Sequence, residues 1–518
     1  MSSEATPLQL RSSSLQLNLR IWRREEAQKR DLKRGGLFLL ALCAFSLFVT
    51  YAVGPLVENK SPNADAPVHV THAATKGAAV NSSTATPATA PTVANRSVFC
   101  GLTTQDSGYV QLPDTVDAHY FFWYFESRRD PRTDPLVLWL TGGPGCSSMM
   151  ALLAENGPCH VLPDLSTRLN PYSWTTVSNV VWLDQPTAVG FTYGDARDGD
   201  DSEERVGANI LSFLEGFVAR HPELAGRPLY ITGESYGGHY VPAAAHYVWQ
   251  HHKRRAADAR LNLQGIAIGN GMTHAAIQLP HYVDMAEANA YGIQLVDAAQ
   301  LALMKADAPE CGARLAQCPH NRSACVDDLA FCADRLLAPL LTAQRNPYDI
   351  RRPCTRMDDP TQCYDLSAVA AYLDAPNVRA ALGVDAAHAG AWQECNMAVN
   401  AAFARTADLA RPFNGVVADL LDDGLRVLIY AGDADLVCNW SGNEAWTLAL
   451  DWSGADGFKA APETVYTTAD GTRAGVSRSF RNQLTFVRVF NSGHMVPHDQ
   501  PAVALDMLRK FLQNETIG

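Results

Sequence analysis

Short apolar runs, each followed by glycine or a polar residue, recur along the chain from residue 134 onward. They cover residues 134–140, 229–232, 425–430 and 484–490, and their length and composition are typical of buried strands. The Ala-rich stretch 240–250 has instead the length and composition of a helix. Buried strands and helices in one chain predict an α/β fold with a mostly parallel central sheet, and the loops after the strands are expected to be exposed.

The N-terminal part has a different pattern. Residues 1–34 hold eight Lys and Arg against four acidic residues, and residues 35–57 hold no charge. Twenty-three uncharged residues can span a bilayer, whereas the core of a cleavable signal is usually shorter. We therefore expect a cytosolic basic leader followed by a transmembrane signal anchor of type II orientation. A cleaved signal segment is the alternative.

Residues 58–97 are rich in Ala, Thr, Pro and Ser, which is typical of a flexible stalk or a removable pro-segment. Residues 98–518 then form the catalytic domain. Sequons for N-glycosylation begin at Asn81, Asn95, Asn321, Asn439 and Asn514. We expect modification at all of these except Asn439, which lies inside a motif described below and is predicted to be buried.

The chain is acidic, with 54 Asp and Glu against 42 Lys and Arg and a formal net charge of −12. This balance argues against nucleic-acid binding. The sequence has no H-E-x-x-H zinc motif, no phosphate loop and no dinucleotide fingerprint, so neither a metal nor another cofactor is expected.

The stretch 233–237 (GESYG) lies between a predicted strand and a predicted helix. A Gly-x-Ser-x-Gly sequence at such a turn is the pattern of a nucleophile elbow, which exposes the serine hydroxyl. Gly233 and Gly237 are expected to allow the sharp turn that pushes Ser235 out of the bend. The pattern alone is weak because it also arises by chance, so its meaning depends on the other candidate residues.

Two later strands end in loops that carry titratable side chains. Asp433 and Asp435 follow the run 425–430, and His494 follows the run 484–490. Ser, then Asp, then His is the chain order found in α/β-hydrolases. A serine hydroxyl needs an imidazole to remove its proton, and the imidazole needs a carboxylate to hold it in one tautomer. The alternative is that these are ordinary loop residues.

The run 134–140 opens into a glycine loop, residues 141–148 (TGGPGCSS). A glycine pair at a strand end leaves backbone N–H groups free to point at negative charge that develops on a substrate carbonyl. The loop is therefore a candidate oxyanion hole, with a simple Gly-Pro turn as the alternative.

Twelve cysteines indicate an oxidising compartment. Cys311, Cys318, Cys325 and Cys332 recur every seven residues, so two lie on one face of each helix of a possible helical hairpin. Antiparallel helices would join Cys311 to Cys332 and Cys318 to Cys325. Zinc is the alternative for four clustered cysteines, but the spacing is not that of paired C-x2-C knuckles.

Eight motifs occur in order between about residue 99 and the C-terminus. They are 139–148, 170–174, 183–186, 190–193, 233–238, 268–271, 430–435 with 438–440, and 493–497. Together they resemble the serine carboxypeptidase family. The resemblance implies an α/β-hydrolase fold that removes the last residue of a peptide at acidic pH. Residues 272–395, which are Ala-rich and cysteine-rich, are then expected to form a helical, disulfide-bonded cap between strands.

The resemblance also implies roles for single residues. Ser235 would be the nucleophile, His494 the general base and acid, and Asp435 the residue that orients His494. The family places this aspartate three residues before a cysteine, which selects Asp435 over Asp433. The oxyanion hole would consist of the backbone N–H groups of Gly143 and Tyr236.

In the family, two glutamates that match Glu155 and Glu234 share a proton and hydrogen-bond the α-carboxylate of the substrate. The N–H of Gly142 and the side chain at position 141 assist them. Two close carboxyls do not both ionise easily, so one stays protonated and donates. Many members carry Asn at position 141, and Thr141 offers a single hydroxyl donor instead, which bears on the strength of carboxylate binding.

The resemblance further implies a disulfide between Cys146 and Cys395 and a free thiol at Cys438 that lines the site. Cys354 and Cys363 would close a short loop, and Cys100 and Cys159 remain as a last pair. The walls of the pocket would include Met150, Ala154, Cys438 and Met495, which favours hydrophobic C-terminal residues in the substrate.

The function predicted from the sequence is therefore a serine-type carboxypeptidase that acts on peptide or protein C-termini through an acyl-enzyme. It is expected in the lumen of the secretory system, in a lysosome or vacuole, and possible membrane attachment would come from residues 35–57. An acyltransferase or esterase on the same triad, or a partner-binding protective protein, are the alternatives. Both glutamates favour the peptidase, because an ester substrate has no α-carboxylate to bind.

Overall fold

Ten strands form one sheet at the centre of the molecule. The computed structural model describes residues 99–254, 261–318, 322–354 and 363–518. The strands lie in the order β1-β2-β6-β3-β7-β8-β11-β14-β13-β12. The neighbours from β6 to β14 pair in parallel, and the pairs at both edges of the sheet are antiparallel. The predicted α/β fold with a mostly parallel sheet is confirmed.

The four apolar runs of the sequence are strands of this sheet. The strands are β1 (Gln105–Gln111), β2 (His119–Phe125), β3 (Leu136–Leu140), β6 (Asn179–Leu183), β7 (Pro228–Glu234), β8 (Asn262–Gly269), β11 (Arg426–Gly432), β12 (Thr464–Thr467), β13 (Arg473–Phe480) and β14 (Leu484–Val489). Two small sheets pair β4 (Cys159–Val161) with β5 (Thr167–Leu169) and β9 (Arg345–Asn346) with β10 (Asp349–Pro353). Every residue of β3 is buried, as expected for a strand covered on both faces.

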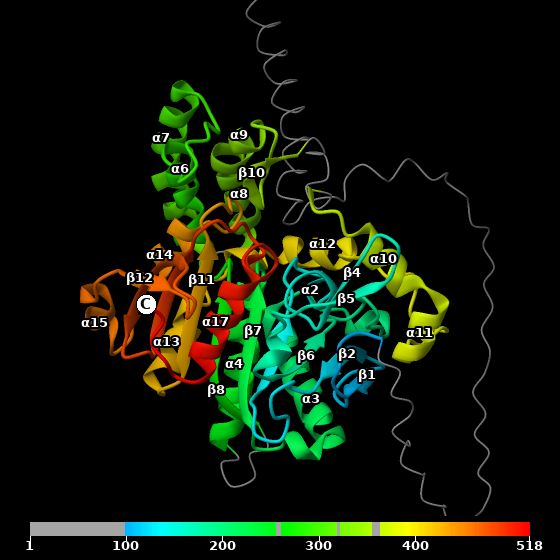
Figure 1. The fold of residues 1–518 in the computed structure, drawn as a ribbon. Coiled ribbons are helices and arrows are strands. Elements are labelled where there is room, and N and C mark those ends of the chain that lie inside the picture. The colour runs from blue at the N-terminus through cyan, green and yellow to red at the C-terminus, as the bar shows by residue number, and fades with distance from the viewer. Residues whose placement is uncertain (1–98, 255–260, 319–321, 355–362) are drawn as a thin grey trace, which may run out of the picture.

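Helices cover both faces of the sheet (Figure 1). On one face pack α3 (Glu203–Arg220), α4 (Gly237–Arg254) and α13 (Asn414–Asp422), and on the other α2 (Met149–Ala154) and α17 (Pro501–Leu512). Strand side chains alternate between these two cores, since Ile231 belongs to the first and Tyr230 to the second. The predicted helix 240–250 lies within α4.

A long insertion separates β8 from β11. It contains α5 (Ala275–Gln278), α6 (Tyr282–Glu287), α7 (Ala298–Leu315), α8 (Arg322–Cys332), α9 (Ala338–Leu341), β9, β10, α10 (Ser367–Asp374), α11 (Pro376–Leu382) and α12 (Met397–Thr406), followed by α13. In Figure 1, α6 to α9 and β10 project from one end of the sheet, while α10 packs beside α2 and β4. The expected cap, residues 272–395, falls inside this insertion.

Five disulfides are present in the described residues. They join Cys100 to Cys159, Cys146 to Cys395, Cys311 to Cys332, Cys318 to Cys325 and Cys354 to Cys363, the same pairs that the sequence suggests. The four evenly spaced cysteines are therefore bonded to one another, and α7 and α8 form the expected hairpin, although Cys318 lies just beyond the end of α7. Cys438 is a free, buried thiol.

The predicted leader (1–34), signal anchor (35–57) and stalk (58–97) lie outside the described residues, as do Asn81, Asn95 and Asn321. Within the described ranges, no helix is both long and apolar enough to cross a bilayer. Asn514 is exposed after α17. The side chain of Asn439 is buried and accepts the Gly442 N–H at 2.9 Å, where it caps α14 (Trp440–Leu448).

Candidate active site

Ser235 occupies the turn between β7 and α4. Its backbone has φ of +64°, which is unusual for a residue with a side chain and typical of the strained serine of an elbow. The role expected of the two glycines needs correction, because neither has positive φ. Gly233 instead makes room, since a Cβ there would come within 2.5 Å of the Leu140 carbonyl oxygen, whereas the closest atom at Gly237 is 3.2 Å away.

Asp435 and His494 meet in the loops that follow β11 and β14, which are neighbouring strands. His494 Nδ1 lies 2.7 Å from Asp435 Oδ2. Asp435 is fully buried, and its carboxylate also accepts the side-chain amide of Asn270 at 2.8 Å and the backbone N–H groups of Val437 and Cys438. These donors hold the carboxylate in one orientation toward the imidazole.

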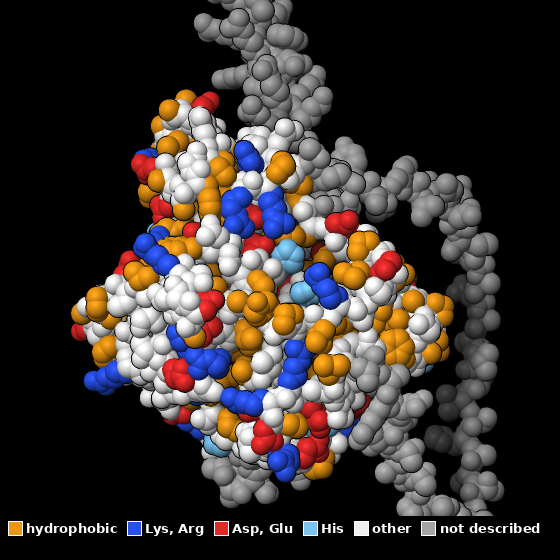
Figure 2. Space-filling view, in the orientation of Figure 1, with side chains coloured by type: hydrophobic (Ala, Val, Ile, Leu, Met, Phe, Trp, Pro, Cys, Tyr) orange, Lys and Arg blue, Asp and Glu red, His pale blue; other side chains and the backbone are white. Residues whose placement is uncertain are grey.

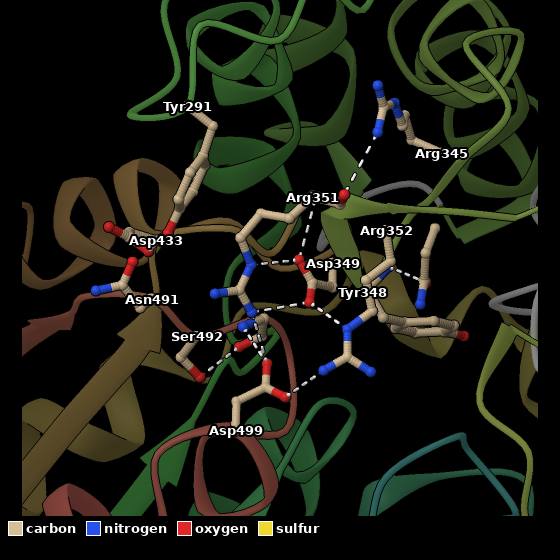
Figure 3. A network of polar contacts seen from close by, with 12 residues as sticks. Tyr291, Arg345, Tyr348, Asp349, Arg351, Arg352, Asp433, Asn491, Ser492 and Asp499 are labelled. Carbon is tan, nitrogen blue, oxygen red and sulfur yellow. Dashed lines mark hydrogen bonds and ion pairs between the residues drawn. The ribbon is translucent and has the colours of Figure 1, made fainter.

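Asp433 lies two residues earlier and has different partners. Its Oδ1 accepts the hydroxyl of Tyr291, which comes from the cap (Figure 3). Burial raises the pKa of Asp433, and the hydroxyl of Tyr291 partly offsets this effect. The aspartate beside His494 is therefore Asp435, in agreement with the motif.

The glycine loop packs directly on the elbow. A Cβ on Gly142 would come within 2.3 Å of the Tyr236 backbone nitrogen, so only glycine fits there. In the described part of the chain, neither the Gly143 N–H nor the Tyr236 N–H has a hydrogen-bond partner. Two free N–H groups beside the Ser235 hydroxyl, which is half-buried and lines a cavity, are the arrangement that an oxyanion requires.

Asp184 holds the far end of the glycine loop. Its Oδ1 accepts the Ser147 hydroxyl at 2.6 Å and the Ser148 N–H at 3.0 Å. Burial raises the pKa of Asp184 to about 6, despite these donors. The disulfide from Cys146 to Cys395 ties the same loop to the insertion.

The carboxyl groups of Glu155 and Glu234 interact with each other, and only 1% and 3% of their surfaces are exposed. Among the described residues, neither oxygen of Glu155 has a hydrogen-bond partner, and Oε2 of Glu234 has none. Burial raises the pKa of Glu155 to about 7. Burial, and next the charge of Glu155, raise the pKa of Glu234 well above its ordinary value. The pair therefore keeps at least one proton in acidic solution, and that proton can be donated.

Thr141 is well placed to donate as well. Its hydroxyl oxygen accepts the indole N–H of Trp139 at 2.9 Å, and its backbone N–H donates to Ser148. Because Trp139 uses the acceptor side of the hydroxyl, the hydroxyl proton remains available for a substrate oxygen. Thr141 thus provides one donor at the position where many family members have an amide.

One cavity brings most of these residues together. It is lined by Thr141, Gly142, Gly143, Cys146, Met150, Glu234, Ser235, Tyr348, Tyr364, Glu394, Cys395, Met397, Asn400, His494 and Met495. Met150 and Met495 are walls, as expected, but Ala154 and Cys438 are not part of the lining. Ala154 packs against the hydrophobic core at the end of α2, and Cys438 is covered on all sides.

The sequence did not indicate every residue of the site. Asn270 belongs to the motif 268–271, and the structure shows that its amide donates to Asp435 and that its Oδ1 accepts the Gly432 N–H at 3.0 Å. The sequence signal that could have indicated Asn270 is its position as a polar residue directly after a buried strand. Tyr348 and Tyr364 come from the insertion, where no pattern points to the cavity.

Comparison with known proteins matches residues 99–514 to the family model described as serine carboxypeptidase. The chain belongs to the serine carboxypeptidase family. Carboxypeptidase Y homolog A of Coccidioides posadasii is 39% identical to this serine carboxypeptidase over 418 residues, which are 79% of this chain and 75% of the relative. Carboxypeptidase Y of Candida albicans is 38% identical over 414 residues, 79% of this chain and 73% of the relative.

A solved structure agrees with the fold of this serine carboxypeptidase. The prohormone-processing carboxypeptidase Kex1 from Saccharomyces cerevisiae superposes with a TM-score of 0.71 at 26% identity, covering 80% of this chain and 94% of that one. The expected α/β-hydrolase fold and serine-type exopeptidase function are confirmed. Peptides are accordingly its substrates.

Proposed function

We propose that this enzyme releases C-terminal residues at acidic pH through an acyl-enzyme on Ser235. The observation that carries the proposal is a buried carboxyl pair: Glu234 lines the same cavity as Ser235 and His494, and Glu155 lies behind it, outside the lining. A general serine hydrolase has no use for such a pair, because burying two carboxyls is costly. An enzyme that must bind the free carboxylate of a peptide needs protonated donors there.

The chemistry follows from the geometry of the loops. His494 removes the proton of the Ser235 hydroxyl as the oxygen attacks the last peptide carbonyl, and Asp435 stabilises the imidazolium through the 2.7 Å contact. The N–H groups of Gly143 and Tyr236 bind the resulting oxyanion. The imidazolium then protonates the leaving amine, and the free amino acid departs. His494 then removes a proton from water as the water oxygen attacks the ester, and the imidazolium returns that proton to the Ser235 oxygen as the shortened peptide leaves.

The substrate α-carboxylate would accept hydrogen bonds from the protonated carboxyl pair, the Thr141 hydroxyl and the Gly142 N–H. As the pH rises through the pKa of the pair, donors are lost and a second negative charge repels the substrate. The acid preference therefore concerns binding of the carboxylate. It does not require a change in the chemistry at Ser235.

Matched peptides test the proposal. A blocked dipeptide with a free C-terminus and the same dipeptide as its C-terminal amide should differ strongly in kcat/KM at pH 5, and much less at pH 8. Varying the last residue should show a preference for hydrophobic side chains, in keeping with Met150 and Met495. Equal activity on the amide and the free acid at pH 5 would contradict the role of the carboxyl pair.

We further propose that the catalytic domain works in the lumen of the secretory system, in a lysosome or vacuole. Five disulfides support an oxidising compartment. The uncharged run 35–57 after a basic leader supports attachment to the membrane in type II orientation.

A further inference from the structure

The small sheet of β9 and β10, with the turn at Pro347 and Tyr348, lies against both loops that carry Asp435 and His494; we call residues 345–353 the cap hairpin. The Tyr348 carbonyl accepts the His494 N–H at 2.7 Å. The Pro347 carbonyl accepts the N–H groups of Leu436 and Val437, directly after Asp435. A single turn of the insertion thus binds the backbone of both catalytic loops.

The contact is close as well as polar. A Cβ on Gly493, the residue before His494, would come within 2.3 Å of the Tyr348 carbonyl oxygen. The rings of Tyr348 and His494 have their centroids 5.1 Å apart. Ile350 donates its N–H to the Ala434 carbonyl at 3.0 Å, on the other side of Asp435. The cap hairpin therefore limits movement of the imidazole on the side away from the sheet.

A chain of charges fastens this hairpin to the histidine loop (Figure 3). Arg351 binds Asp349 through Nε at 2.7 Å and through Nη2 at 2.8 Å. The same Nη2 lies 3.1 Å from Oδ2 of Asp499, at the end of α16 (Val496–Asp499). That oxygen of Asp499 also accepts the Gly493 N–H at 2.7 Å. The guanidinium is thus linked to the residue before His494 through one carboxylate.

The two carboxylates of this chain are almost completely buried. The side chain of Asp349 is 0% exposed and that of Asp499 is 2% exposed, whereas Arg351 is 25% exposed. Arg352 adds contacts to both at 3.0 and 3.3 Å, from a more exposed position. Basic, acidic and histidine side chains gather on this part of the surface, next to the projecting cap, in Figure 2. Asp349 and Asp499 share both arginines, of which Arg351 is the more buried, and removing a partner would leave a buried charge uncompensated.

We propose that Arg351 and Asp499 are positioning residues of the reaction: their ion pair locks the cap hairpin onto the His494 loop and keeps the imidazole aligned between Asp435 and Ser235. The inference rests on the proposed roles of the triad. Neither residue belongs to the lining of the cavity. Their effect should appear in the rate of acylation and not in substrate binding.

The test uses Arg351→Ala, Asp499→Asn and the double variant of the full chain, with Arg345→Ala as the matched control. Arg345 lies on the same hairpin and, among the residues that the structure describes, its side chain donates to the Arg351 carbonyl, away from Asp499 (Figure 3). We expect each single variant to lower kcat about 10- to 100-fold, since a misplacement of about 1 Å can cost that much, with KM changed less than twofold. The control should stay within twofold of wild type.

Two further readouts separate positioning from a general loss of structure. The rate at which a phosphonate inhibitor labels Ser235 should fall in parallel with kcat, because labelling needs an aligned imidazole but no substrate carboxylate. Added guanidinium ion should restore part of the activity of Arg351→Ala, while the Asp499→Asn variant should not respond. The double variant should be little worse than either single one, since both break the same link.

Several results would overturn the inference: wild-type kcat in Arg351→Ala, a raised KM at constant kcat, strictly additive losses in the double variant, or an equal loss in Arg345→Ala. If Arg351→Ala fails to fold, Arg351→Lys replaces it. We expect an intermediate kcat for this variant, and either a wild-type kcat or a complete loss of activity would contradict the inference. His494→Ala is assayed alongside. If it retains activity, the proposed triad fails, whatever the result at Arg351.

Discussion

Replacing Glu155 by Gln should make the folded protein less sensitive to pH. Glu155 is 1% exposed, and burial raises its pKa to about 7 from 4.5. The folded state therefore holds a proton that the unfolded state releases above pH 4.5. By linkage, the free energy of unfolding that depends on this group is fully present below pH 4.5 and decreases as the pH rises toward 7. Glutamine has no proton to lose, so this decrease should vanish in the variant.

The magnitude follows from the difference between the two pKa values. At about 1.4 kcal/mol per pKa unit, moving from 4.5 to about 7 corresponds to about 3 kcal/mol by pH 7. That is a large part of the 5–15 kcal/mol by which a typical domain is stable. The strong coupling to Glu234 means that the pair, and not Glu155 alone, sets the midpoint of the change.

Chemical denaturation at pH 5 and pH 7, with the disulfides intact, measures the effect. The wild type should lose about 2 kcal/mol more than Glu155→Gln between these values, because the rest of the change lies below pH 5. Glu310→Gln is the control, because Glu310 is an exposed partner of Arg314 on α7 and should change the pH dependence by less than about 0.5 kcal/mol. If Glu155→Gln loses as much stability as the wild type, Glu155 is already ionised at pH 5 and the account of the carboxyl pair is wrong.

Three other predictions concern the nucleophile, the triad and the N-terminus. Ser235→Ala should abolish labelling by an active-site phosphonate without changing the melting temperature, and labelling at the wild-type rate would exclude Ser235 as nucleophile. Asn270→Ala should lower kcat about tenfold with KM nearly constant, because the amide orients Asp435 at 2.8 Å; a change confined to KM in steady-state kinetics would contradict this. The full chain should remain with membranes after alkaline carbonate washing. Recovery of a soluble protein that begins near residue 60 or later would show instead that the N-terminal segment is removed.

Much of the fold could be predicted because parallel strands buried on both faces appear as continuous apolar runs. Strands β3, β7, β11 and β14 are of this kind, and the polar residues after them stand at the site. The long motifs also placed His494 beside the correct one of two aspartates. The local sequence pattern therefore indicated those site residues that directly follow a strand of the central sheet.

The rest of the site depends on how the insertion folds back. Tyr348 reaches the cavity from a two-residue turn about 80 residues after β8, and nothing in its neighbourhood marks it as a wall. Ala154 and Cys438 lie near proposed site residues in the chain but pack in the two hydrophobic cores and do not line the cavity. Which side of an element faces the substrate is decided by tertiary packing, which a motif does not record.

The disulfide between Cys146 and Cys395 spans 249 residues, and this separation matters while the chain is being made. A domain emerges from the ribosome with its N-terminal part first. Cys100 and Cys159, only 59 residues apart, are both available long before Cys395 exists, while Cys146 stands between them as a competing thiol. The imidazole of His494 is synthesised later still. Chains that are still on the ribosome therefore carry the elbow and the glycine loop without His494, the proposed base.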